Sequence, residues 1–299
     1  MTRTALIAGQ GALPRTLASA LAGTDWFACH LDGFAPTGVG QSRGFRIETL
    51  GSFIADLRAD GVTRVCFAGR IARPPLEAGA VDAATMPLVP RMMQALQSGD
   101  DAALRTVIAF FEEAGLEVVG AQDLMPALLD LPLTGTPSEG DLSDIARAAE
   151  VHRGLADLDI GQGCVVAGAQ VLAVEAAPGT DWMLASLARR PTAPRPASGG
   201  GIFGGDLFGG AADWLSGGGP AQGMPDFARP EGGVFFKAPK AGQDRRIDLP
   251  AIGPQTVRAA AAAGLNGIAV EAGGVLVLER EDVAAQLRAT GLFLASWSP

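Results

Sequence analysis

Short apolar runs alternate with helix-like stretches through the first part of the chain. The apolar runs predict strands at residues 4–8, 26–31, 45–48, 62–68 and 116–120. The stretches between them predict one helix that ends at residue 21 and two that span residues 53–60 and 102–114. Because strands that alternate with helices form a mostly parallel sheet with helices on its faces, we expect a Rossmann-like α/β domain over residues 1–132.

The second part of the chain has a different order of elements. Residues 133–140 are rich in Pro, Gly, Ser and Thr, which predicts a linker. The pattern then predicts helices at 142–158, 182–189, 254–263 and 282–290, and strands at 163–168, 170–176, 233–236, 268–271, 275–278 and 292–295. The strands within 163–176 and within 268–278 are predicted hairpins. We therefore expect an α+β domain over residues 141–299, and two lobes with a cleft between them.

Residues 191–232 interrupt this second domain with a stretch dominated by Gly, Pro, Ala and Ser. Such a composition does not build a compact core, so we predict a long inserted excursion. A tolerated insertion is the simpler interpretation, since long surface loops cost little free energy. The alternative is that its scattered aromatic residues pack back as a lid.

Residues 237–253, which we call the basic segment, read KAPKAGQDRRIDLPAIG. Its charged residues are Lys237, Lys240, Asp244, Arg245, Arg246 and Asp248. A buried strand does not carry so many charges, and a solvated loop is the plain alternative. However, the segment follows an apolar strand and leads into a helix, a junction at which anion sites are commonly built. Lys and Arg bind phosphate oxygens, and Asp binds hard cations, so the mixture favours phosphate chemistry.

The turn after the first strand carries Gly9, Gly11 and Ala12. It has the G-x-G spacing of a dinucleotide-binding turn, but Pro14 stands where the third glycine would be. A tight strand-to-helix turn is the simpler interpretation. Arg70 follows the strand at 62–68, at the sheet edge where open α/β sheets bind ligands, and a surface turn explains it equally well.

Two further acidic positions precede predicted helices. Asp100 or Asp101 serves most simply as a helix N-cap, worth about 1 kcal/mol. Thr180 or Asp181 could cap the helix at 182–189 in the same way. A carboxylate at that junction could equally face a ligand.

Composition narrows the possible classes of protein. Apolar residues make up 48% of the chain, and the net charge is −9, which disfavours general nucleic-acid binding. Cys29, Cys66 and Cys164 lie in apolar runs, so we expect buried free thiols in a reducing compartment. His30 and His152 form no zinc-ligand pattern with them. A strand begins within a few residues of the N-terminus without signal-peptide features, which predicts a cytoplasmic protein.

Seven stretches in this order resemble one family. They are residues 7–14 (IAGQGALP), 67–74 (FAGRIARP), 98–105 (SGDDAALR), 158–166 (LDIGQGCVV), 171–181 (VLAVEAAPGTD), 237–257 and 267–280 (GIAVEAGGVLVLER). The chain resembles the UDP-2,3-diacylglucosamine pyrophosphatases of lipid A biosynthesis, in the form unrelated to the metallophosphoesterases (the LpxI family). Each stretch alone is a weak signal, and their common order is a strong one.

The resemblance implies magnesium-dependent hydrolysis of UDP-2,3-diacylglucosamine to UMP and 2,3-diacylglucosamine 1-phosphate (lipid X). It further implies a substrate held between two domains, a homodimer, and transient contact with the cytoplasmic face of the inner membrane.

We assign roles on this basis. The expected catalytic residues are Asp244, Arg246, Lys240 and Gln243. The expected substrate-binding residues are Gly9, Gly11, Ala12, Arg70, Thr180, Lys237 and Asp248. The expected magnesium ligands are Asp244 and Asp181.

The chain departs from the family pattern in two places. Ala177-Pro178 stands where the family usually has a Glu, and residues 191–232 replace a short connection. Two rival functions stay open: a non-catalytic sugar-nucleotide-binding protein and a dinucleotide-dependent oxidoreductase. Release of UMP in the presence of magnesium would separate the first rival from the hydrolase, and NAD binding would test the second.

Overall fold

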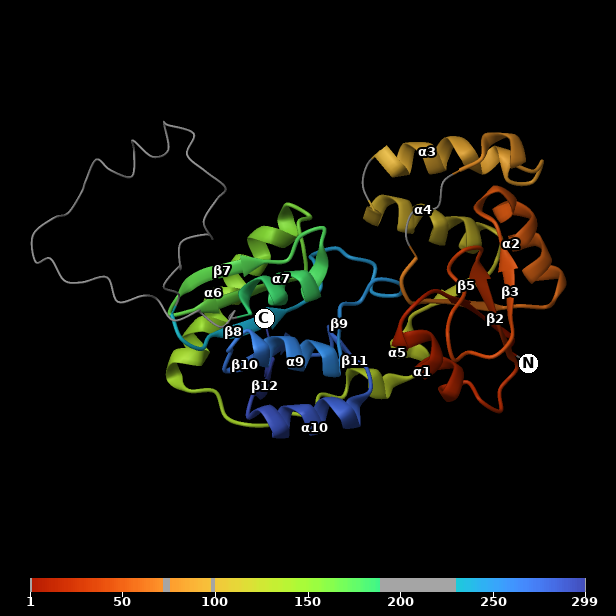
Figure 1. Ribbon diagram of the computed structural model, residues 1–299. Coiled ribbons are helices and arrows are strands. Elements are labelled where there is room, and N and C mark those ends of the chain that lie inside the picture. Colours follow the sequence, from red (N-terminus) through yellow and green to blue (C-terminus); the bar gives the residue numbers. More distant parts are fainter. Residues whose placement is uncertain (1, 72–75, 98–99, 189–229, 299) are drawn as a thin grey trace, which may run out of the picture.

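A computed structural model of the chain describes residues 2–71, 76–97, 100–188 and 230–298, without the side chains of residues 100 and 101. Two lobes lie side by side (Figure 1). Most of the predicted insertion at 191–232 lies outside the described residues, as do the side chains proposed to cap the helix after residue 99.

The first lobe is built on a parallel sheet with the strand order β3-β2-β1-β4-β5. Its strands are β1 (Thr4–Ala8), β2 (Trp26–Leu31), β3 (Ser42–Phe45), β4 (Arg64–Ala68) and β5 (Glu117–Val119). Its α-helices are α1 (Ala12–Ala20), α2 (Leu50–Ala59), α3 (Val89–Gln97), α4 (Asp100–Glu113) and α5 (Ala121–Leu124). Between these elements lie short 3-10 helices, which are η1 (Ile47–Thr49), η2 (Ala78–Ala80), η3 (Met86–Leu88) and η4 (Pro126–Leu129). This is a doubly wound arrangement, so the expected Rossmann-like domain is confirmed.

Two local predictions for this lobe were wrong. The third strand is β3 rather than residues 45–48, because the chain turns into η1 around the buried carboxylate of Glu48. That carboxylate accepts hydrogen bonds from Arg46 Nε at 3.1 Å and from the Glu77 amide at 2.9 Å. Helix α3 was not predicted, although it packs against α4.

The turns after β1 and β4 are held against each other by their backbones. Gln10 and Arg70 exchange two backbone hydrogen bonds of 2.9 Å. A Cβ on Gly9 would lie 2.5 Å from the Arg70 carbonyl oxygen, so only glycine fits there. Gly9 thus serves the contact between two turns, whereas in a dinucleotide-binding turn glycine makes room for a pyrophosphate.

The second lobe is built on a mixed sheet with the order β12-β10-β8-β6-β7. Its strands are β6 (Gly163–Ala167), β7 (Gln170–Val174), β8 (Val234–Lys237), β10 (Gly267–Glu271) and β12 (Phe293–Trp297). Its α-helices are α6 (Glu139–Asp157), α7 (Gly179–Leu187), α9 (Pro254–Ala262) and α10 (Arg280–Thr290). Strands β8, β10 and β12 run parallel, and β6 is antiparallel to β8 and β7. The expected hairpin at 163–176 is confirmed, with its turn at Gly168 and Ala169 in positive φ.

The second predicted hairpin, at 268–278, was wrong. After β10 the chain leaves the main sheet, and β11 (Leu276–Val277) pairs in parallel with β9 (Ala251–Ile252). Leu276 is buried in a cluster with Leu6, Leu17 and Leu128 of the first lobe. Burial of this side chain against the first lobe explains why the strand separates from β10.

The three cysteines are buried and free, as predicted. Among the described residues, no helix combines the length and the apolar character needed to cross a membrane.

Candidate functional site

A cavity of about 1160 Å³ receives side chains from both lobes. The first lobe contributes the carboxyl ends of β1 and β4 together with α3 and α4. The second lobe contributes residues 160–162, 175–177 and Gly179, and Lys240, Ile247 and Asp248 of the basic segment. In a doubly wound sheet, this edge between β1 and β4 is where ligands usually bind.

The first lobe gives the cavity an apolar wall, which we call the apolar end. It consists of Phe45, Ile47, Leu50, Phe67, Met92, Met93, Leu96, Leu104, Val107, Ile108 and Phe111. Phe67 and Phe111 meet edge to face, with ring centroids 5.2 Å apart. A wall of this kind can accept hydrocarbon and offers no partner to a charged group.

The polar side chains of the lining come from both lobes, and we call them together the polar end. They are Gln10, Arg70, Gln162, Glu175, Lys240 and Asp248. Of the predicted site residues, Arg70, Lys240 and Asp248 therefore reach the cavity. Gln10, Gln162 and Glu175 were not singled out from the sequence, although Gln10 lies between the two glycines of the first turn.

The basic segment bridges the two lobes. Arg105 of α4 donates to the Gly242 carbonyl, and Gln122 of α5 donates to the Arg245 carbonyl at 3.1 Å. Arg246 forms an ion pair with Glu112 of α4. The segment thus belongs to the second lobe by sequence and is held in place partly by the first.

Asp244 and Arg246 form a close pair within this segment. Asp244 Oδ1 accepts Arg246 Nε at 2.9 Å, and Oδ2 accepts Nη2 at 2.7 Å. The Arg246 side chain holds the pKa of Asp244 below its ordinary value, because it bonds to the ionised form. The described cavity lining includes neither residue. Direct contact of either side chain with a ligand in the cavity would therefore require a rearrangement.

Two further contacts shape the polar end. Lys240 Nζ pairs with Asp159, and Gln243 donates to Asp248 Oδ2. Gln243 Oε1 also accepts the Lys240 amide at 2.9 Å. Gln243 therefore connects Lys240 with Asp248.

Lys237 lies behind the cavity wall, with only 5% of its surface exposed. Its ammonium donates to Thr180 Oγ1 at 2.6 Å and lies 3.4 Å from Glu175 Oε2. Within the described chain, Glu175 Oε2 is buried and accepts no hydrogen bond. Lys237 and Thr180 are thus brought together, but around Glu175 rather than on the described cavity lining.

Other predicted site residues lie elsewhere. The described lining includes Gln10 but not Gly9, Gly11 or Ala12. Asp181 is exposed in the first turn of α7, whose N-cap position is Pro178. No group of three or more His, Cys, Asp or Glu side chains able to hold a metal occurs in the described parts of the chain. A magnesium ion here would therefore depend on one or two carboxylates and on phosphate oxygens of a ligand, which is a usual arrangement for this ion.

A histidine anchors the start of the basic segment. His152 of α6 is 5% exposed, and its Nε2 lies 2.9 Å from the Ala238 carbonyl oxygen. Burial lowers the pKa of His152 below its ordinary value of 6.5, while Ala238, Glu271 and Glu175 oppose the shift. The neutral ring with a proton on Nε2 donates this hydrogen bond.

We predict a loss of stability on mild acidification that depends on His152. The unfolded chain takes up a proton near pH 6.5, whereas the folded chain resists it, so the free energy of unfolding falls below that pH. Between about pH 7.5 and about pH 5.5 the His152 contribution amounts to at most about 1.4 kcal/mol. Urea unfolding of the wild type and of His152→Gln measures it. His30→Gln, the only other histidine of the chain, is the control. Equal losses in wild type and His152→Gln would contradict the assignment.

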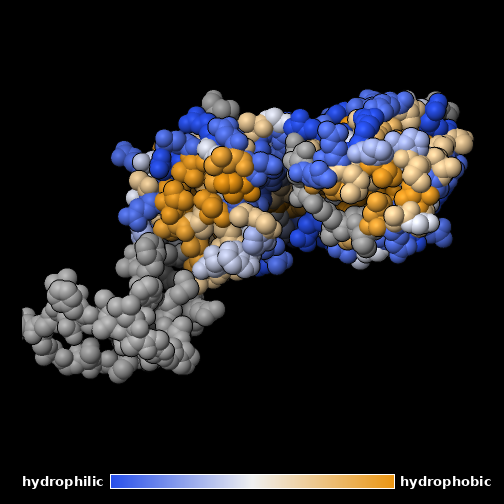
Figure 2. All heavy atoms as spheres, turned by 90° about the horizontal axis from the view of Figure 1, so that it is seen from above, coloured by the Kyte–Doolittle hydropathy of each residue, from blue (hydrophilic) through white to orange (hydrophobic). Residues whose placement is uncertain are grey.

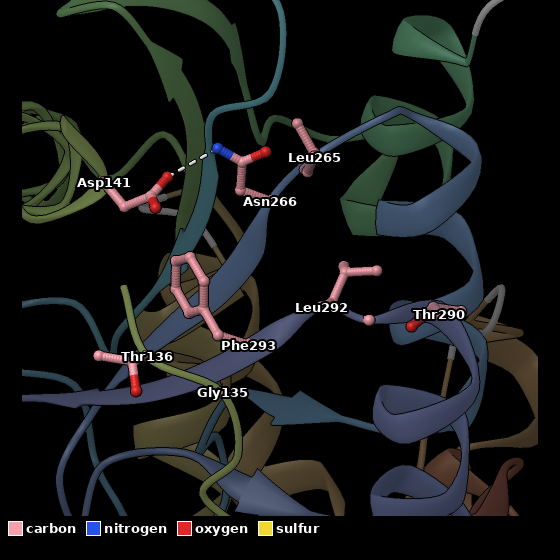
Figure 3. Close-up of a pocket in the computed structure, with 9 residues that line it drawn as sticks. Gly135, Thr136, Asp141, Leu265, Asn266, Thr290, Leu292 and Phe293 are labelled. Carbon is pink, nitrogen blue, oxygen red and sulfur yellow. Dashed lines mark hydrogen bonds between the residues drawn. The ribbon is translucent and has the colours of Figure 1, made fainter. Parts of the chain in front are cut away.

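A smaller hollow of about 320 Å³ lies at the other side of the second lobe (Figure 3). Asn266 Nδ2 donates to Asp141 Oδ1 there at 2.8 Å, and Asp141 also caps α6 together with Ser138. Since both Asp141 oxygens accept hydrogen bonds within the fold, this hollow is best explained as a packing junction between the linker and the sheet.

Comparison with known proteins places the chain in a family. The LpxI N-terminal domain matches residues 3–128, and the LpxI C-terminal domain matches residues 131–295. A protein of Caulobacter vibrioides named UDP-2,3-diacylglucosamine pyrophosphatase LpxI is 39% identical over 306 residues, covering 100% of this chain and 99% of that one. A structure of glycinamide-RNase-transformylase T from Mycobacterium tuberculosis is 19% identical, with a TM-score of 0.20 over 58% of this chain and 44% of that one, too low to support an argument. The two domain matches and the full-length relative show that this chain belongs to the LpxI family.

Proposed function

We propose that the chain hydrolyses the pyrophosphate bond of UDP-2,3-diacylglucosamine, releasing UMP and 2,3-diacylglucosamine 1-phosphate (lipid X) for lipid A biosynthesis. The observation that carries the proposal is the cavity of about 1160 Å³, whose lining combines an apolar wall with charged and amide side chains. A diacyl sugar nucleotide has the same division between hydrocarbon and charge. The family relative is named for this substrate.

The apolar end between α3 and α4 would hold the acyl chains. Ile108 and Phe111, at its base, are 2% and 1% exposed, so hydrocarbon placed against them is shielded from water. Each methylene group buried in this way contributes about 0.8 kcal/mol to binding. On this proposal, the cavity would serve as the substrate cleft between the lobes.

The polar end would hold the diphosphate. Arg70 and Lys240 reach the cavity from opposite lobes and would neutralise phosphate oxygens. Arg246 would add a bidentate contact when its guanidinium turns from Glu112 towards the ligand. Asp244 orients that guanidinium through its two carboxylate oxygens.

Asp244 and Asp248 offer the hard oxygen donors that magnesium prefers, and they lie within a single turn of the basic segment. Asp181, the other predicted ligand, is exposed on α7 and would reach the same ion only with a change in side-chain or loop position. Magnesium, when bound, would supply positive charge to the non-bridging phosphate oxygens. The carboxylates of this chain would hold the ion or orient the attacking water.

Release of UMP from purified substrate is the direct test. The enzyme yields UMP and the sugar 1-phosphate with magnesium and little product after chelation. Tight binding of the substrate without release of UMP would identify a non-catalytic sugar-nucleotide-binding protein instead.

A homodimer and a location at the cytoplasmic face of the inner membrane stay predictions from the family resemblance.

A further inference from the structure

Four large apolar side chains combine two properties that are usually separate. Ile71, Met93, Leu96 and Leu104 line the cavity, and they are also 39%, 45%, 37% and 40% exposed. Met93 and Leu96 belong to α3, and Leu104 belongs to α4. We call these four residues the rim. Single exposed apolar residues need no explanation, but a group of them at the mouth of an apolar cavity marks a site of interaction.

Behind the rim, the described cavity lining on these two helices is apolar. Met92, Val107, Ile108 and Phe111 of the same two helices line the cavity behind it. An acyl chain that entered over the rim could pass from these four side chains to the apolar side chains behind them. Each methylene kept away from water in transit shifts an equilibrium about fourfold, so such a path favours transfer from one apolar medium to another.

A second group of exposed apolar residues lies on the other lobe. Val171 and Val174 on β7 are 41% and 38% exposed, and Trp182 on α7 is 63% exposed. Seen from above, apolar atoms gather over α3 and α4 on one lobe and over β7 and α7 on the other (Figure 2). Apolar surface of both lobes is thus present on one side of the molecule, the upper side in Figure 1. A broad flat partner can touch both lobes at once, whereas a peptide in a groove cannot.

We propose that this face docks on a lipid bilayer, with the rim inserted among the lipids and the cavity mouth opening towards them. The inference deepens the proposed function, since the bilayer is the source of a diacyl substrate. The chain carries a net charge of −9 and the sequence of α4 begins with Asp100 and Asp101, so anionic lipid headgroups do not drive the contact. Apolar insertion drives it, and Trp182 takes the interfacial position that tryptophan favours.

Flotation of the full chain with phosphatidylethanolamine vesicles, without substrate, tests the docking. The wild type floats with these vesicles, and adding phosphatidylglycerol gives no increase in binding. Leu96→Ser combined with Leu104→Ser lowers the ratio of bound to free protein at least about tenfold. Leu133→Ser is the matched control, because Leu133 is 60% exposed, lies in the linker and is not part of the described cavity lining. Circular dichroism establishes that each variant is folded.

The outcomes for docking and for hydrolysis are separable. A wild type that releases UMP from detergent-dispersed substrate but does not float would overturn the docking and leave the hydrolase intact. Floating without any UMP release would overturn the hydrolase alone. If the rim variant changes the oligomeric state and vesicles bind neither protein, the face is an interface between copies of this chain, and the docking proposal is wrong.

Discussion

Replacing Asp244 by alanine is expected to lower the turnover of UDP-2,3-diacylglucosamine by about 10²–10³-fold. The substitution removes the carboxylate that bonds to Arg246 through both oxygens, and it removes a donor for magnesium. Arg246 is then held by Glu112 alone, which turns it away from the polar end of the cavity. The loss should fall on kcat more than on KM if the pair acts in the transition state.

The fold should survive this substitution. The Asp244 and Arg246 side chains are 19% and 35% exposed, so water can solvate the unpaired guanidinium. Asp56→Ala is the matched control, since Asp56 pairs with Arg43 at 2.7 Å on the surface of the first lobe. Turnover close to that of the wild type in Asp244→Ala would contradict the proposed catalytic role of Asp244. The magnesium concentration for half-maximal rate, measured in Asp244→Asn and Asp181→Asn, shows which of the two carboxylates holds the ion.

Replacing Lys237 by methionine is expected to lower the free energy of unfolding by about 3–5 kcal/mol. The chain has only two lysines, Lys237 and Lys240, and their surroundings differ sharply. Lys237 is buried against Glu175, whose own side chain is 13% exposed. Removing the ammonium leaves a buried carboxylate without a countercharge, which costs far more than the ion pair itself is worth.

Lys240→Met is the matched control, because Lys240 pairs with Asp159, whose side chain is 58% exposed. That pair lies near the surface, so we expect a change of less than about 1 kcal/mol. The double variant Lys237→Met with Glu175→Met removes both buried charges and should recover most of the stability. Denaturant unfolding of the wild type, Lys237→Met, Glu175→Met and the double variant completes the cycle. A Lys237→Met protein as stable as the wild type would contradict this prediction.

The sequence supported the fold class well and the positions of particular strands less well. The alternation of apolar runs and helical stretches predicted the parallel sheet of the first lobe, because that alternation leaves few other topologies. The strand β11 was assigned to the wrong partner, since a glycine turn between two apolar runs is also typical of a hairpin. Only the burial of Leu276 between the lobes distinguishes the two cases.

The sequence pointed to some residues of the candidate site and missed others, because the missed residues are defined by contacts between distant segments. Charge density made the basic segment conspicuous, and Lys240, Gln243 and Asp248 do meet at the polar end of the cavity. Glu175 gave no such signal, because a glutamate after an alternating strand is an ordinary solvated residue on sequence alone. Glu175 follows β7 and is buried beside Lys237 at the end of β8. The two residues are far apart in the chain.

The amino-acid sequence by itself determined the two lobes, the basic segment and the resemblance to one family. Each of these follows from the local pattern of apolar and charged residues or from the order of short motifs. The tertiary structure alone decided which lysine is buried, where Arg246 is held, and that apolar residues of α3 and α4 line a cavity and its rim rather than a closed core. The physical reason is that burial and pairing depend on contacts between distant segments. Neither an apolar side chain nor a charge specifies its partner by its position in the chain.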